Sequence, residues 1–423
     1  MKSVVIQPAP LHGVITPPPS KSAAHRAIIC AALSKGDSRI YPYVPSDDID
    51  ATIGVMRALG AKIQIIDNSL YISGTDTLNV KEAALDCRES GSTLRFLIPV
   101  AAAAGGCFTF TGSGCLPSRP IGPYLDSLPA AGVMCETATG GLPLILRGEL
   151  RSGVFSLPGN VSSQFITGLL LALPRLTGDS RIMLSSPLES AGYIELTIDM
   201  MSRFGVHVTK SDGEYLIKGG QTYAAGDLQV EGDWSQAAFW LAAGALGGHV
   251  ACERLNMASN QGDMAISDIL HRFGAVIVRS GGRIEAQAGN LHGIEIDASQ
   301  IPDLVPVLAA ASCFASGRTV IKNAARLRIK ESDRLHTTTL GLRALGAQIN
   351  ETENGLVIDG GRLRGGEAQG AGDHRIVMAL SIAAAFCEGT SVINGCECVS
   401  KSYPEFFRDF KLLGGIADVI DMG

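Results

Sequence analysis

The sequence lacks the patterns that mark several common classes of protein. No apolar run reaches the length of about 18 residues that a membrane-spanning helix needs before a charge, a glycine or a proline interrupts it. The ten cysteines form no Cys-x-x-Cys pair, so we expect free thiols rather than disulfides or a zinc site. The start, MKSVVIQPAP, has no basic-then-apolar leader pattern. We therefore expect a cytoplasmic protein without a membrane span.

Common nucleotide-dependent, metal-dependent and hydrolytic motifs are missing as well. There is no GxxxxGKS or GxxxxGKT loop for a nucleoside triphosphate, no HExxH zinc helix and no GxSxG nucleophile turn. The glycine-rich stretch GGRLRGGEAQGAG lacks the strand–helix spacing of a dinucleotide site, so we interpret it as a turn-rich connector. We expect no metal and no cofactor.

Positive charge is not in excess. Lys and Arg number 35 against 41 Asp and Glu, which gives a formal net charge of −6. A nucleic-acid partner held by bulk electrostatics is therefore not expected. Any anion that binds this chain needs a local cationic site.

The sequence does contain an internal repeat. A helical phrase, a glycine and a β-rich run recur with a period of about 70 residues, as in MRALGAKIQI and LRALGAQIN. A glycine at this place is typical of a left-handed helix end, from which a strand leaves. The recurring glycines are Gly60, Gly132, Gly205, Gly274, Gly346 and Gly414.

A second phrase recurs with the same period and predicts six buried helices. Each copy opens with Ser or Asp, which are preferred N-cap residues, and is then apolar on nearly every side. The copies begin at Ser20, Ser90, Ser162, Ser235, Asp303 and Asp373.

Six repeats in 423 residues predict two domains of similar size, because one hydrophobic core rarely grows so large. The expected fold class is α/β, with sheets that cover the buried helices. We expect one domain at residues 20–229 and a discontinuous domain at residues 1–19 plus 230–423. The first strand, SVVIQPAP, would then pair within the second half of the chain.

Cations recur near the starts of the predicted buried helices and in the loops between repeats. A helix N-terminus favours anions through its free N–H groups and its dipole. One Lys or Arg alone is typical of a solvated surface, and one Ser or Asp alone is typical of a cap. Their recurrence at equivalent places predicts a cleft for a small polyanion. The cations are Lys21, Arg26, Arg95, Arg119, Lys330, Arg334, His374, Arg375 and Lys401.

Nine motifs in order along the whole chain resemble the enolpyruvyl transferases, and among them the branch that acts on shikimate 3-phosphate. The motifs are PPSKSAAHRA, ESGSTLRF, SRPIGPYLDSL, VSSQFITGLLLA, SAGYIEL, IPDLVPVLAA, RIKESDRL, DHRIVMAL and SKSYPEFF. The resemblance implies two domains of three βαβαββ repeats, with buried parallel helices enclosed by sheets as an inside-out barrel. It also implies an active site in the cleft between the domains.

The resemblance implies transfer of the enolpyruvyl group from phosphoenolpyruvate to the 5-hydroxyl of shikimate 3-phosphate, with release of phosphate. The expected partners are these two small molecules, without nucleic acid or membrane, and the expected state is a monomer without a cofactor. Asp303 would be the base for the attacking hydroxyl, Glu331 the acid for the methylene carbon, and Lys21 would lie near both substrates.

The matching positions also give the expected binding residues. Contacts to shikimate 3-phosphate are expected from Lys21, Ser22, Arg26, Ser162, Ser163, Gln164, Ser190, Tyr193, Asp303 and Lys330. Contacts to phosphoenolpyruvate are expected from Lys21, Gly91, Arg119, Gln164, Arg334, Arg375 and Lys401, with Arg95 and His374 in support.

Three positions depart from the pattern of the family. Glu89 stands where Asn is frequent, Phe96 where Pro is frequent, and Arg326 where some members have an Asn ligand, so we transfer no contact to Arg326. These departures leave the expected reaction unchanged and leave affinity and inhibitor response open.

Two alternatives remain at this point. The sister family that acts on a UDP-amino sugar has a reactive Cys before an Arg-Pro pair, and Cys115 precedes Arg119 and Pro120 here. The spacing is one residue short, and Lys21-Ser22 replaces that family's Lys-Asn, so we expect Cys115 to be unreactive. The other alternative is a non-catalytic binder of phosphorylated metabolites, which needs the cations but neither Asp303 nor Glu331.

Overall fold

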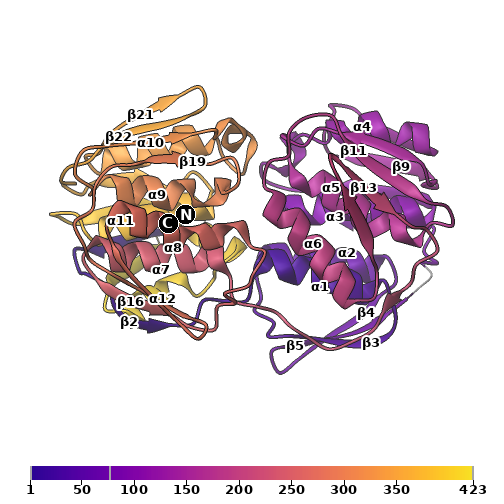
Figure 1. Cartoon of the computed structure of the whole chain (residues 1–423), viewed down its shortest axis with the longest axis horizontal. Helices are drawn as coiled ribbons and strands as arrows, with labels where there is room; N and C mark the ends of the chain where they lie inside the picture. The colour runs from indigo at the N-terminus through magenta and orange to yellow at the C-terminus, as the bar shows by residue number, and fades with distance from the viewer. Residues whose placement is uncertain (1, 76–77, 422–423) are drawn as a thin grey trace. The chain divides into compact units, whose positions relative to one another are not determined.

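The computed structural model describes residues 2–75 and 78–421, which form two compact units (Figure 1). Unit 1 is Met1–Pro18 together with Glu231–Gly423, and unit 2 is Pro19–Val230. Each unit combines helices with several small sheets, so the chain is a mixed α/β protein.

Each unit contains three helices that are buried on nearly every side. They are α1 (Lys21–Ala32), α3 (Gly91–Ala104) and α5 (Ser163–Ala172) in unit 2, and α7 (Trp234–Leu246), α9 (Val305–Ser312) and α11 (His374–Ala384) in unit 1. Four of the predicted starts are confirmed, because the side chain of the capping residue accepts a backbone N–H in the first turn. These caps are Ser20, Ser90, Ser162 and Asp373.

The other two predicted starts are wrong. Helix α7 begins two residues earlier than expected, because the Asp233 side chain accepts the N–H of Gln236 and leaves Ser235 inside the first turn. Asp303 lies within a 3-10 turn, η5 (Pro302–Leu304), that precedes α9. Its carboxylate is bound by two arginines instead of capping the helix.

The more amphipathic helices alternate with the buried ones and lead to the recurring glycines. They are α2 (Asp47–Ala58), α4 (Gly122–Ser127), α6 (Ala191–Arg203), α8 (Ile266–Phe273), α10 (Arg334–Ala344) and α12 (Phe406–Leu412). All six glycines have φ between 77° and 106°, the left-handed region that ends a helix, so this prediction is confirmed. A strand follows each glycine, as expected.

The sheets of unit 2 repeat one pattern, in which a parallel pair is extended by two antiparallel strands. The first has the order β14 (Tyr223–Ala224), β3 (Ser34–Tyr41), β5 (Ser69–Gly74) and β4 (Lys62–Ile66), with β15 (Leu228–Gln229) also on β3. The second has the order β6 (Glu82–Asp86), β7 (Gly106–Thr111), β9 (Leu144–Gly148) and β8 (Val133–Thr137). The third has the order β10 (Val154–Leu157), β11 (Ser180–Leu184), β13 (Glu214–Ile217) and β12 (Val208–Ser211).

The sheets of unit 1 have the same pattern. The first has the order β17 (Val276–Ser280), β18 (Arg283–Gln287), β16 (His249–Cys252) and β2 (His12–Ile15). The second has the order β19 (Glu295–Asp297), β20 (Arg318–Lys322), β22 (Gly355–Asp359) and β21 (Gln348–Thr352). The third has the order β23 (Glu367–Gln369), β24 (Ser391–Asn394), β1 (Lys2–Gln7) and β25 (Ile416–Asp421).

The first strand of the chain belongs to the last of these sheets. Strand β1 pairs antiparallel with β24 and β25, with Val4 opposite Ile393 on one side and opposite Val419 on the other. The predicted pairing of SVVIQPAP with the second half of the chain is therefore confirmed. Val4 and Ile6 are fully buried and anchor the strand in the core of unit 1.

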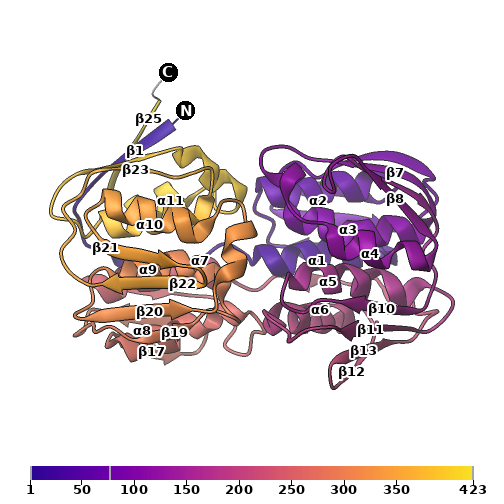
Figure 2. The ribbon, with the colours of Figure 1, turned by 90° about the horizontal axis from the view of Figure 1, so that it is seen from above.

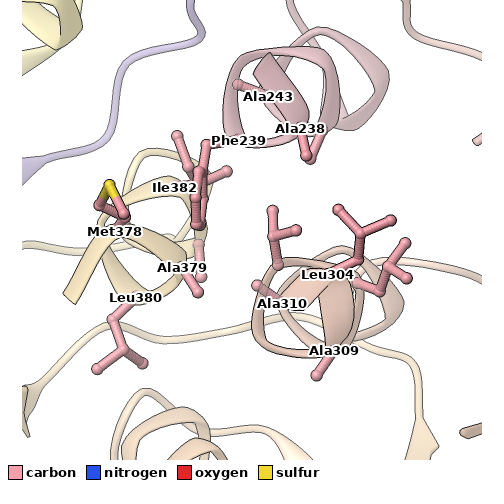
Figure 3. Packing of buried hydrophobic residues seen from close by; sticks show 14 of the residues in the cluster. Ala238, Phe239, Ala243, Leu304, Ala309, Ala310, Met378, Ala379, Leu380 and Ile382 are labelled. Carbon is pink, nitrogen blue, oxygen red and sulfur yellow. The ribbon is translucent and has the colours of Figure 1, made fainter. Parts of the chain in front are cut away.

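The core of unit 1 is formed where α7, α9 and α11 pack together (Figure 3). Small side chains such as Ala238, Ala310 and Ala379 let the helices approach closely, and Phe239 and Ile382 fill the space between them. The sheet of β20 and β22 covers α9 and α10 (Figure 2). Helices α10 and α11, which pack in this unit, begin at Arg334 and His374, two of the residues predicted for the site.

In the described part of the chain, no helix is both long enough and apolar enough to cross a lipid bilayer.

Candidate functional site

The charged groups predicted in unit 1 meet around one buried arginine. Arg334 is the first residue of α10 and is 1% exposed. Its Nε donates to Asp373 Oδ2 at 2.7 Å, its Nη1 to Asp303 Oδ1 at 2.9 Å, and its Nη2 to Glu331 Oε2 at 2.6 Å. One guanidinium therefore orients three carboxylates that come from three different segments. We call Asp303, Lys330, Glu331, Arg334, Asp373 and Arg375 the carboxylate cluster.

Three cations contact the carboxylate of Asp303: Arg334, Arg375 and Lys330. Arg375 Nη2 donates to its Oδ2 at 3.2 Å, and Lys330 Nζ lies 3.8 Å from its Oδ1. Burial by itself raises the pKa of Asp303, but the charges of Arg375, Lys330 and Arg334 outweigh it and hold this pKa well below its usual range. Asp303 is therefore ionised at neutral pH, as a group that accepts a proton must be.

Burial has the opposite effect on Lys330. Desolvation lowers the pKa of Lys330 to about 8, although the Asp303 carboxylate favours the charged form. Lys330 thus exchanges its proton more readily than an exposed lysine does.

Two further predicted residues of unit 1 lie near the cluster. His374 follows Asp373 at the start of α11 and is 1% exposed, with Nδ1 4.0 Å from Asp373 Oδ1. Lys401 ends the 3-10 helix η7 (Cys396–Lys401), which packs on α11, and is 4% exposed.

Arg26, on α1, is the most deeply buried arginine of the described part of unit 2, with 2% of its surface exposed. Its Nε donates to Thr197 Oγ1 at 2.7 Å, its Nη1 to the Ser22 carbonyl at 2.6 Å and its Nη2 to the Tyr193 carbonyl at 3.0 Å. Its guanidinium carbon lies 4.9 Å from the centre of the Phe96 ring. Phe96, which departs from the family pattern, therefore supports Arg26.

Lys21 is the first residue of α1, and its Nζ lies 2.5 Å from Asp48 Oδ2 on α2. The Ser22 carbonyl accepts a hydrogen bond from Arg26, as described above. Two charged side chains, Lys21 and Arg26, thus make contacts at the start of α1.

A hydrogen-bonded chain joins the starts of α3 and α5. Arg95 Nη1 donates to Gln164 Oε1 at 2.7 Å, and Gln164 Nε2 donates to Ser92 Oγ at 3.0 Å. Arg95 also packs its guanidinium over Phe165, 5.1 Å from the ring centre. Arg95 is therefore bound to Gln164, for which a substrate contact is expected.

Gly91 and Arg119 are in direct contact. Gly91 opens α3, and a Cβ at this position would lie 2.7 Å from Arg119 Nη1 and 2.9 Å from Arg119 Cζ. The missing side chain thus leaves room for the Arg119 guanidinium, which the resemblance gives as another expected contact of phosphoenolpyruvate. Arg119 is 7% exposed.

The predicted serines lie at two helix starts of unit 2. Ser162 caps α5 and accepts from the N–H of Gln164 at 3.3 Å, and Ser163 is the first residue of that helix. Ser190 precedes α6 with φ of 55°, and Tyr193 lies in the first turn of α6. Both helix starts can offer backbone N–H groups to an anion.

Two acidic residues of these sites were missed by the sequence analysis. Asp48 binds Lys21, and Asp373, interpreted only as a cap, also binds Arg334. Neither was distinguishable in the sequence, because Asp is common at the cap and in the first turn of a helix. Only the contacts across segments show their second role.

Comparison with known proteins gives a consistent result. A model of the family EPSP synthase (3-phosphoshikimate 1-carboxyvinyltransferase) matches residues 5–410. The chain belongs to the EPSP synthase family. Two relatives named 3-phosphoshikimate 1-carboxyvinyltransferase, from Clostridium kluyveri and Clostridioides difficile, are 48% and 45% identical, and each match covers 100% of both chains. A solved EPSP synthase from Acinetobacter baumannii is 27% identical, with a TM-score of 0.83 and 100% of both chains covered.

Membership of the EPSP synthase family decides between the alternatives that the sequence left open. The chain is a transferase that acts on small molecules, in the step of aromatic amino acid biosynthesis that joins an enolpyruvyl group to shikimate 3-phosphate. A non-catalytic binder and the sister family with a reactive Cys are both disfavoured. Cys115 is exposed, and its backbone N–H donates to Glu89 Oε1 at 3.0 Å.

Proposed function

We propose that the chain transfers the enolpyruvyl group of phosphoenolpyruvate to the 5-hydroxyl of shikimate 3-phosphate, with the carboxylate cluster as its chemical centre. The observation that supports this most directly is the contact of Arg334 with both Asp303 and Glu331, at 2.9 and 2.6 Å. It holds a prospective base and a prospective acid side by side in a largely buried setting. General acid–base catalysis of this kind typically contributes about 10²- to 10⁴-fold to a rate.

The helix starts of unit 2 are proposed to bind the two anionic substrates. The start of α1 carries Lys21 and Ser22, and the buried Arg26 lies one turn further along this helix. The starts of α5 and α6 carry Ser162, Ser163, Ser190 and Tyr193. These residues would hold shikimate 3-phosphate, because free N–H groups, hydroxyls and cations all favour a phosphate. Gln164, Gly91 and Arg119 would contact phosphoenolpyruvate.

In unit 1, Arg375, Lys401 and Arg334 are the proposed cations for phosphoenolpyruvate. Arg375 is the most suitable of the three for direct contact, because each of its described bonds to Asp303 is relatively long at 3.2 Å. Arg334 uses every nitrogen of its guanidinium on protein carboxylates. Lys330 would contact shikimate 3-phosphate beside Asp303.

In the proposed addition step, one carboxyl group accepts a proton and the other donates one. Asp303 accepts the proton of the 5-hydroxyl while the oxygen forms a bond to C2 of phosphoenolpyruvate. The electron pair of the C2–C3 double bond takes the proton of Glu331 and turns the methylene into a methyl group. The product is a tetrahedral carbon that carries the ether oxygen, the carboxylate and the phosphate.

The proposed elimination step reverses these roles. Glu331, now a carboxylate, removes a proton from the methyl group, the double bond re-forms, and the C–O bond to phosphate breaks. The proton that Asp303 holds can pass to the departing phosphate. Both carboxyl groups end in the state in which they began, so no other reactant is consumed.

This mechanism requires residues of both units to act on the same pair of substrates. We therefore propose that the active site is shared by unit 1 and unit 2. The finer points of the expected fold, three βαβαββ repeats per unit as an inside-out barrel, belong to the same proposal. So do a monomeric state and a cytoplasmic location.

The test is a phosphate-release assay with both substrates. Wild type should release one phosphate per enolpyruvyl group transferred. Lys21→Met, in unit 2, and Asp303→Ala, in unit 1, should each abolish most turnover, and shikimate 3-phosphate should still bind to the Asp303 variant. Full turnover in either variant would show that its unit does not contribute as proposed.

A further inference from the structure

One buried acid of unit 1 has no role in the proposed mechanism. Asp263 lies in the 3-10 helix η4 (Gly262–Ala265), beside the first turn of α7, and is 2% exposed. Its Oδ2 accepts a hydrogen bond from Ser235 Oγ. Its Oδ1 is buried and has no hydrogen-bond partner among the described residues.

The surroundings of Asp263 differ from those of the carboxylate cluster. Asp303, Glu331 and Asp373 each contact an arginine, whereas no ion pair to Asp263 is found within residues 2–75 and 78–421. An ionised carboxylate with one buried, unpartnered oxygen is costly, because nothing replaces its lost hydration. A neutral carboxyl group avoids most of this cost.

Four groups face Asp263 from the elements around it. Ser235 on α7 donates a hydrogen bond, and Asp233, which caps α7, adds a like charge. Asp303 in η5 adds a second like charge, and Arg375 on α11 is the opposing cation. Burial, followed by the charge of Asp303, raises the pKa of Asp263 to about 7 against the attraction of Arg375.

We infer that Asp263 holds a proton in the ligand-free protein and that its ionisation controls how strongly Arg375 binds an anionic substrate, which makes Asp263 a positioning residue for phosphoenolpyruvate. When Asp263 is neutral, it does not compete with Asp303 for the charge of Arg375. When Asp263 is ionised, a further negative charge competes for Arg375 and repels the substrate. The inference rests on the proposed role of Arg375 in binding phosphoenolpyruvate.

The test compares Asp263→Asn with Asp268→Asn. Asn keeps the size and one acceptor oxygen but never ionises. Asp268 lies five residues away on α8, with its side chain 73% exposed in contact with Arg279, so its variant is a matched control. The KM for phosphoenolpyruvate and kcat are measured from pH 6 to pH 8.5 by phosphate release.

As the pH rises through 7, the KM of wild type and of Asp268→Asn should rise about tenfold more than the KM of Asp263→Asn. The reason is that one ionisation changes an affinity by at most tenfold per pH unit. Titration of the substrate itself appears equally in all three proteins. A profile of Asp263→Asn that superimposes on wild type would overturn the inference. A KM that is raised by the same factor at every pH would assign Asp263 a merely structural role and would also overturn it.

Two further measurements keep the inference testable. Ser235→Ala removes the hydrogen bond that favours the ionised form, so the rise in KM should move to higher pH, and an unmoved rise would count against the inference. Infrared spectroscopy of the ligand-free protein at pH 6 should show a protonated-carboxyl band that Asp263→Asn removes. This band does not depend on turnover, so its absence contradicts the inference, whereas an inactive wild type contradicts the proposed function.

Discussion

Two buried arginines, one in each unit, show how differently the two halves of the molecule use the same side chain. Arg26 is 2% exposed and Arg334 is 1% exposed. Arg26 is held by hydroxyl and carbonyl oxygens and by the face of Phe96. Arg334 is held by three carboxylates. Arg26 is therefore a buried positive charge held by neutral groups, whereas Arg334 is part of a buried network of opposite charges.

The pKa values of the two arginines follow from this difference. Desolvation lowers the pKa of Arg26 to about 10, since no carboxylate within residues 2–75 and 78–421 pairs with it. Burial also acts to lower the pKa of Arg334, but Asp373, Glu331 and Asp303 outweigh it and raise this pKa above its usual value. Arg26 therefore still attracts anions through its uncompensated charge, whereas Arg334 mainly orients carboxylates. This difference supports the proposal that Arg26 of unit 2 attracts substrate, whereas Arg334 of unit 1 orients the groups that transfer protons.

Asp303→Ala is the variant with the largest expected effect, and it tests whether proton transfer belongs to unit 1. Loss of the base should lower kcat by about 10²- to 10⁴-fold, the usual contribution of general acid–base catalysis. Binding of shikimate 3-phosphate, measured by calorimetry, should weaken much less, because its phosphate is proposed to bind in unit 2. If binding and turnover fell by the same factor, the two units would not divide the work in this way.

The paired variants Arg334→Met and Arg26→Met compare the two arginines directly. Arg334→Met removes the arginine that binds Glu331 and Asp373 and leaves Asp303 with Arg375 and Lys330, so it should lower the free energy of unfolding by about 3–5 kcal/mol at pH 8. Arg26→Met leaves only neutral acceptors unpaired and should cost about 1–3 kcal/mol. Urea unfolding measures both values.

The pH dependence of this pair sharpens the comparison. Asp303 has a lowered pKa in the folded protein, so its ionised form stabilises the fold above the usual carboxyl pKa, and this contribution is lost as the pH falls through the folded value. Without Arg334 the cluster protonates at higher pH, so the cost of Arg334→Met should shrink between pH 8 and pH 5. The cost of Arg26→Met should stay nearly constant over that range. Equal pH slopes would contradict the contrast.

Gly91→Ala tests how unit 2 holds Arg119. The new Cβ would lie 2.7 Å from Arg119 Nη1, so the guanidinium has to move. We expect the KM for phosphoenolpyruvate to rise by about tenfold, the effect of about 1.4 kcal/mol of lost binding, with little change in kcat. Gly122→Ala is the matched control, because nothing lies within 4 Å of a Cβ there. A similar KM in both variants would exclude the contact as the cause.

Much of the fold was predictable because it depends on local and periodic signals. The six glycines and four of the six caps act within a few residues of chain, and the structure confirms them. The errors arose where the side chain binds a residue that lies far away in the sequence. Asp303 is bound by Arg334 and Arg375 and therefore does not cap α9. Asp233 caps α7 in place of Ser235, which donates to Asp263 instead.

The candidate site was less predictable, for a related reason. The residue types at the helix starts indicated cations around an anion, and the resemblance supplied their proposed roles. The sequence could not show that Arg334 joins Asp303, Glu331 and Asp373, because these contacts span 31, 3 and 39 residues of chain. Nor could it distinguish Asp263 from any other acid near a helix start. Which carboxylate has a cation and which has none is decided by tertiary packing.

The smallest expected effect belongs to Cys115→Ser. If unit 2 binds substrate by charge and forms no covalent intermediate, the exposed thiol of Cys115 takes part in no step of the reaction. The kcat of the variant should then differ from that of wild type by less than about twofold. Phosphate release by the variant and by thiol-alkylated wild type measures this directly. Partial slowing by alkylation alone would reflect the bulk of the added group near Arg119. Loss of turnover in the serine variant as well would show that Cys115 of unit 2 acts as a nucleophile. The proposal that unit 2 binds substrate while unit 1 carries out the chemistry would then be wrong.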